Sequence, residues 1–164
     1  MVNEDQERRK REAQALFERA HELQLSGKLE EAEALYKRSI EAFPTAEAYT
    51  FLGWTYSFMR RYDDAIRECH KAIEVDPAFG NPYNDIGAYL IEKGQLDQAI
   101  PWLEQAMQAP RYENYCFPHL NLGRIWERKG QWYKAMAAYQ KALEANPNYT
   151  LAQKAIGRIR GFLN

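Results

Sequence analysis

The sequence has few of the residues on which metal binding and catalysis usually depend. Its two cysteines, Cys69 and Cys116, are far from C-x-x-C spacing, so we expect neither a disulfide framework nor a cysteine metal site. The three histidines, His21, His70 and His119, do not stand at metal-ligand or nucleophile spacing. A glycine-rich phosphate loop is also missing. We therefore predict no catalytic residues, no metal site and no cofactor, and a protein that is not an enzyme.

Long apolar runs are missing as well. No stretch approaches the roughly 20 apolar residues that a membrane helix needs. The first residues, 1–12, form a charge cluster with no apolar signal segment behind it. These features predict a soluble, cytoplasmic protein that does not bind membranes.

Excess charge of either sign is missing from the chain as a whole, whose formal net charge is -1. Its distribution is uneven: residues 1–110 carry 13 basic and 20 acidic side chains, whereas residues 111–164 carry 9 basic and 3 acidic ones. The total gives no argument for nucleic acid as a partner. The basic last third leaves an RNA-binding repeat protein as a remote alternative, although the acidic remainder would repel a phosphate backbone.

What the sequence does contain is a repeat with a period of about 34 residues. Each copy has a small residue flanked by large apolar ones, then an alanine, then a second large residue, and in most copies a proline. The copies are Leu16, Arg19, Ala20, Leu23, Ala32, Tyr36 and Pro44; Tyr49, Leu52, Gly53, Tyr56, Ala65, Cys69 and Pro77; Tyr83, Ile86, Gly87, Leu90, Ala99 and Leu103; and His119, Leu122, Gly123, Trp126, Ala135, Tyr139 and Pro147.

The glycines of this repeat have a physical explanation. Gly53, Gly87 and Gly123 stand inside predicted helices, where glycine costs roughly 0.5–1 kcal/mol relative to alanine. A partner helix that approaches closely would offset this cost, and each copy has an alanine at the matching place on the next helix. Cys69 takes the second large position of its copy, so we expect it to be buried.

The pattern resembles that of the tetratricopeptide repeat family. The resemblance implies an all-α fold, a right-handed α-α superhelix (solenoid) of about four helical hairpins plus a C-terminal capping helix. We expect a single domain over 1–164, with repeats at about 13–45, 46–79, 80–115 and 116–149 and a capping helix at about 150–162. The nine expected helices span about 5–26, 30–42, 46–59, 63–75, 80–93, 97–109, 114–129, 133–145 and 149–162. The third repeat is two residues longer, and its extra residues fall in a connection, 109–114, whose shape the pattern does not predict.

In this family the first helices of successive repeats line a concave groove, and the resemblance therefore identifies groove candidates. They change along the chain from aromatic through amide to basic. The candidates are Phe51, Trp54, Phe58, Asn84, Asn121, Arg124, Arg128, Lys154 and Arg158. Asparagine can bind the backbone of an extended peptide, and arginine and lysine can pair with carboxylates. We expect a protein-protein interaction module or adaptor whose partner protein or peptide carries apolar and acidic groups.

Two alternatives stay open. In the first, Phe51, Trp54 and Phe58 pack under an N-terminal helix that folds across the groove, and the basic residues are only a solvated face. In the second, the chain is a self-associating assembly or scaffold protein, a homo-oligomer. The opposite charge of its two ends and the apolar residues of the last helix indicate this possibility. Those residues are Ile156, Ile159, Phe162 and Leu163.

Overall fold

The computed structural model describes residues 2–163, and nine helices account for most of them. The helices are α1 (Val2–Leu25), α2 (Leu29–Ala42), α3 (Ala46–Phe58), α4 (Tyr62–Val75), α5 (Asn81–Glu92), α6 (Leu96–Gln108), α7 (Cys116–Arg128), α8 (Trp132–Ala145) and α9 (Thr150–Leu163). Each end lies within three residues of its predicted position. None of the helices in residues 2–163 combines the length and the hydrophobicity that a membrane-spanning segment requires.

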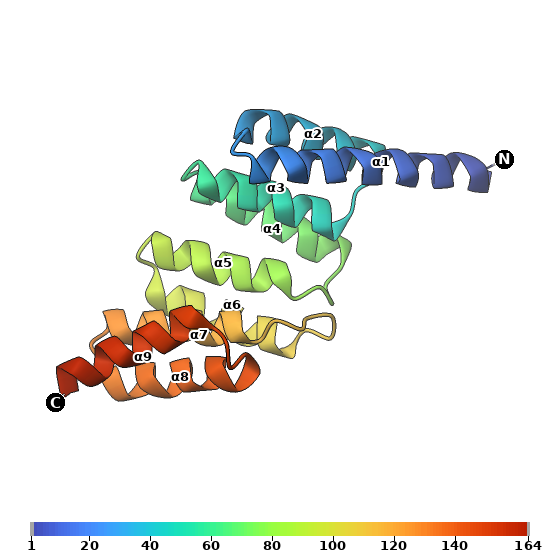
Figure 1. Cartoon of the computed structure of the whole chain (residues 1–164). Helices are drawn as coiled ribbons and strands as arrows, with labels where there is room; N and C mark the ends of the chain where they lie inside the picture. Colours follow the sequence, from blue (N-terminus) through green and yellow to red (C-terminus); the bar gives the residue numbers. More distant parts are fainter. Residues whose placement is uncertain (1, 164) are drawn as a thin grey trace.

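The helices are arranged as hairpins that stack in chain order (Figure 1). Helix α1 packs on α2, α3 on α4, α5 on α6, and α7 on α8, while α9 covers α8. The first helices of neighbouring hairpins also contact one another, because α3 touches both α1 and α5, and α5 touches α7. The first helices therefore form one continuous inner surface, which is where the groove candidates were expected.

Every hairpin turn uses the same backbone geometry. In each turn, a backbone N–H donates to the carbonyl of the residue five positions earlier, in the first helix, at 2.8–2.9 Å in all four hairpins. This closure needs a left-handed residue just before the donor. Glycine fills that place in three hairpins, and Arg60 adopts φ 60° in the remaining one. The left-handed residues are Gly27, Arg60, Gly94 and Gly130.

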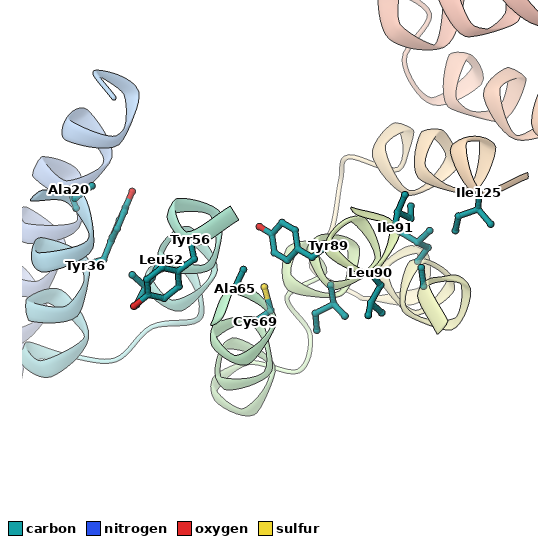
Figure 2. Packing of buried hydrophobic residues seen from close by; sticks show 14 of the residues in the cluster. Ala20, Tyr36, Leu52, Tyr56, Ala65, Cys69, Tyr89, Leu90, Ile91 and Ile125 are labelled. Carbon is teal, nitrogen blue, oxygen red and sulfur yellow. The ribbon is translucent and has the colours of Figure 1, made fainter. Parts of the chain in front are cut away.

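The core runs continuously from one hairpin to the next. Figure 2 shows Tyr36, Leu52, Cys69 and Ile91 in a row of buried side chains that crosses the helix pairs. Cys69 is completely buried, so its predicted place in the array is confirmed. Because the row is shared by neighbouring hairpins, each hairpin covers apolar surface of the next, and the array is stabilised as a whole.

The predicted close contacts at the helix glycines are confirmed. A Cβ atom added to Gly53 would lie 2.9 Å from the carbonyl oxygen of Ala65, and one added to Gly87 would lie 2.5 Å from Cδ2 of Leu103. At Gly123 the Cβ atom would lie 2.4 Å from the ring of Tyr139. The absent side chains are what allow the two helices of these three hairpins to approach this closely.

The connection between α6 and α7, whose shape the sequence did not predict, is held against the α4–α5 connection. Its Arg111 N–H donates to the carbonyl of Ala78 at 2.9 Å. The Arg111 guanidinium pairs with Asp76 at 2.7 Å and with Glu47 at 2.9 Å, and lies over the ring of Phe79. These contacts place the next residues of the connection beside the inner surface.

Replacement of Gly53 by alanine tests the close contact. Gly53→Ala should lower the free energy of unfolding by about 1–3 kcal/mol, because the new methyl group meets a backbone carbonyl rather than a movable side chain. The control is Gly157→Ala in α9, where nothing lies within 4 Å of the new Cβ atom. It should raise the free energy of unfolding by roughly 0.5–1 kcal/mol. Urea unfolding followed by circular dichroism measures both, and equal effects would contradict the contact at Gly53.

Candidate functional site

Four rings from α1 and α3 form a continuous row on the inner surface, which we call the aromatic row. Phe17 lies 5.1 Å from Phe51, Phe51 lies 5.6 Å from Trp54, and Trp54 lies 5.4 Å from Phe58, between ring centroids. Trp54 is 38% exposed and Phe58 is 55% exposed. Of the three predicted aromatic residues, Phe51 is half-buried and packs against α1. The expected exposure is therefore confirmed, and the alternative of burial under α1 is wrong for Trp54 and Phe58.

The two amide candidates lie between neighbouring first helices. Nδ2 of Asn121 in α7 donates to Oδ1 of Asn84 in α5 at 3.1 Å, and Arg124 donates to Oδ1 of Asn121 at 3.1 Å. Both asparagines are buried, so the expectation that they would be exposed on the groove face is wrong. The reason is that α5 and α7 lie directly against each other, and the amides satisfy one another across that contact. That they bind a peptide stays a prediction.

The basic candidates are largely paired within the chain. Arg124 forms an ion pair with Glu92 of α5 at 2.5 Å, and Arg158 of α9 pairs with Glu127 at 2.7 Å. Arg128 donates to the carbonyl of Ile91 at 2.7 Å. Glu92, which comes from a helix distant in sequence, therefore adds a second carboxylate to Glu127 in this basic part of the surface.

The remaining basic candidate, Lys154, is exposed on α9 and has no recorded ion pair within residues 2–163. Lys154 and Arg128 both lack a carboxylate partner among the described residues, since the hydrogen bond of Arg128 goes to a neutral carbonyl. A role of these residues in binding acidic groups stays a prediction, and pairing within the chain weakens it.

Between the aromatic row and the amides lies a cavity of about 230 Å³ that the sequence did not single out. We call it the Asp85 pocket. Its walls include Phe51 and Trp54 of α3, Asn84 and Asp85 of α5, Tyr112 of the α6–α7 connection, and Phe117 of α7. The side chains come from three repeats, so only the stacking of hairpins creates the pocket.

The carboxyl of Asp85 is half-buried in this pocket. Burial raises its pKa to about 7, although a hydrogen bond from Nδ2 of Asn84, 3.5 Å away, acts in the opposite direction. Tyr112 is 5% exposed, and its phenol oxygen is buried with no hydrogen-bond partner among the described residues. An acidic residue on a first helix was the only sequence signal for this site, because the sequence does not show which charges are paired.

The inner surface therefore offers noncovalent contacts: exposed rings, a pocket with one carboxyl group, and cations that are mostly paired. In residues 2–163, no group of three or more histidine, cysteine, aspartate or glutamate side chains is arranged to hold a metal ion.

Comparison with known proteins gives partial likenesses to much longer proteins. The human protein O-mannosyl-transferase TMTC1 is 28% identical over 145 residues, which are 85% of this chain and 16% of that protein. Sperm-associated antigen 1 of mouse is 39% identical over 83 residues, which are 51% of this chain and 9% of that protein. The chain spans less than a fifth of either relative, so these matches show shared repeats and not a shared activity.

Solved structures show the same fold. The structure reported for PilF of Pseudomonas aeruginosa matches with a TM-score of 0.84 and 21% identity, over 92% of this chain and 68% of that one. YrrB, described as a TPR protein with an unusual peptide-binding site, matches with a TM-score of 0.69 and 19% identity, over 87% and 73% of the two chains. The expected all-α superhelix of helical hairpins is thus confirmed.

Profiles described as Tetratricopeptide repeat match four segments of the sequence. The segments are residues 13–45, 46–79, 81–111 and 116–149. Together they cover most of the 164 residues. The chain belongs to the tetratricopeptide repeat family.

Proposed function

We propose that this chain is a noncatalytic interaction module, an adaptor that holds a peptide or helix of a partner protein against its concave inner surface. The observation that carries the proposal is the aromatic row, in which Trp54 and Phe58 remain exposed beside an open pocket. Clustered exposed rings mark contact sites more often than free surface, and tryptophan is enriched among the residues that dominate binding energy. The peptide-binding description of the YrrB structure supports the same reading.

The inner surface is also held in shape before any partner binds. The hydrogen bond between Asn121 and Asn84 and the ion pair between Arg124 and Glu92 both join α7 to α5. Such links fix the spacing of neighbouring first helices, so little ordering remains to be done on binding. A preformed surface of this kind suits a partner segment that is itself flexible.

Removal of the most central exposed ring tests the proposal. Peptides selected on the wild-type protein from a random display library should bind Trp54→Ala at least about tenfold more weakly, a loss of roughly 1.4 kcal/mol. Fluorescence polarisation with labelled peptides measures the affinity. The matched control is Tyr133→Ala, because Tyr133 lies on the second helix α8 and is 80% exposed. The proposal fails if both variants bind as tightly as the wild type.

Self-association is a second candidate, and the C-terminal end of the array favours it. Phe162 is 68% exposed and Leu163 is 42% exposed, and the Phe162 ring lies 6.0 Å from the partly exposed Trp132. Ile156 and Ile159, which the sequence also suggested for this role, are buried in the core beside α8. That part of the expectation is wrong, because these residues face the preceding hairpin.

Light scattering separates the self-association candidate from the binding module. If the end patch associates, the wild-type molar mass should exceed that of the monomer, and Phe162→Glu should return it to the monomer value. An apolar contact should persist as salt rises, whereas attraction between oppositely charged ends should weaken. A monomer mass for the wild type at all concentrations rejects this candidate.

A further inference from the structure

The Asp85 carboxylate on the inner surface has no cationic partner among residues 2–163. Among the residues that line the Asp85 pocket, Asp85 alone is charged. Its recorded hydrogen bond within residues 2–163 comes from Asn84 at 3.5 Å, which is beyond the usual range of such bonds. Asn84 makes its shorter contact with Asn121 instead, at 3.1 Å. The carboxylate has therefore lost water without gaining a strong partner, which is an unfavourable state for a charge.

Other acidic residues around the inner surface do have partners. Glu92 is paired with Arg124, and Glu127 with Arg158. Asp85 differs from these two residues, because it is partly buried and has no cationic partner among residues 2–163.

The titratable groups that interact with Asp85 are uncharged near neutral pH. They are the Cys69 thiol of α4, the Tyr89 phenol of α5 and the Tyr112 phenol of the α6–α7 connection. Burial raises the pKa of each of the three above its ordinary value. None of them can supply the positive charge that the carboxylate lacks.

The walls of the pocket suit a cation. The phenol oxygen of Tyr112 is buried without a hydrogen-bond partner among the described residues, and the rings of Phe51, Trp54 and Phe117 line the remainder. Aromatic ring faces attract ammonium and guanidinium groups, most strongly where water is excluded. At about 230 Å³, the cavity is smaller than the roughly 300–1,000 Å³ of sites for whole small molecules. Its size fits the end of one side chain.

We propose that the Asp85 pocket receives the ammonium or guanidinium end of a lysine or arginine side chain of the partner, beside an apolar anchor held by Trp54 and Phe58. This inference rests on the proposed binding function and adds the chemistry of the partner. It replaces the sequence-based emphasis on acidic partner groups, because the structure shows most of the chain's cations paired and this carboxylate unpaired. A cation from outside would compensate the charge that folding left in the pocket.

The free protein should show the effect of the unpaired carboxylate on stability. The pKa of Asp85 is about 7 in the folded chain against an ordinary value of 3.8, so ionisation opposes folding. Wild-type stability should therefore fall, relative to Asp85→Asn, as pH rises from about 4 to about 7, and the difference should level off above that. Urea midpoints of both proteins across this range measure it. Other groups titrate equally in both proteins, so a constant difference would show a carboxylate that is already compensated, and would overturn the proposal.

A two-way comparison tests the pocket itself. The probes are display-selected peptides that carry a lysine or arginine, each paired with a copy in which that residue is norleucine. On the wild type, the norleucine copy should bind at least about tenfold more weakly. On Asp85→Asn the two copies should bind almost equally, because the interaction that distinguishes them is gone. Asp97→Asn is the control, since it removes the same charge from an aspartate of α6 that is 80% exposed.

The outcomes separate the two proposals. Suppose that Trp54→Ala weakens binding, but that the norleucine substitution lowers the affinity for the wild type and for Asp85→Asn by the same factor. The groove then binds peptides, and the proposal of a cation pocket is wrong. A selection that enriches no basic residue at a constant distance from an apolar one also overturns the pocket. If Asp97→Asn reduces the preference as much as Asp85→Asn does, the attraction is only the general charge of the surface. If Trp54→Ala changes nothing, the proposed function itself fails.

Discussion

The close approach of the two helices in each hairpin is the constraint on which the rest of the structure depends. It is possible because glycine or alanine stands at the contact, as at Gly53 against the Ala65 carbonyl. Larger side chains there would separate the helices, and the hairpin would no longer present matched apolar edges to its neighbours. Since the core is a row shared between hairpins, the spacing inside one hairpin sets the stacking of all of them.

Stacking in turn decides which side chains meet on the inner surface. The first helices contact one another directly, so residues about 34 positions apart become neighbours. Asn84 and Asn121 are joined in this way by a hydrogen bond, and Arg124 reaches Glu92 by the same route. These links use polar groups to hold neighbouring repeats together, and they remove those groups from the set that a ligand could bind.

Stacking of the hairpins also leaves some groups on the inner surface without a partner. The exposed rings of Trp54 and Phe58 and the carboxyl of Asp85 lie on the same surface. Apolar area exposed to water and a charge without a partner are both unfavourable in the free chain. A partner that covers the rings and brings a cation would relieve both at once, which connects the proposed binding function to the proposed chemistry of the partner.

The sequence by itself determined the helices, their hairpin pairing and the small-residue contacts, because these follow from local periodicity and from side-chain size at fixed spacing. It also predicted that Phe51, Trp54 and Phe58 share a face, since residues three and four apart in a helix do so. Tertiary structure alone decided which polar groups are paired. Glu92 meets Arg124, Asn84 meets Asn121, and Asp85 meets no cation in the described part of the chain. These outcomes depend on angles and distances between repeats, and a one-dimensional pattern carries no information on them.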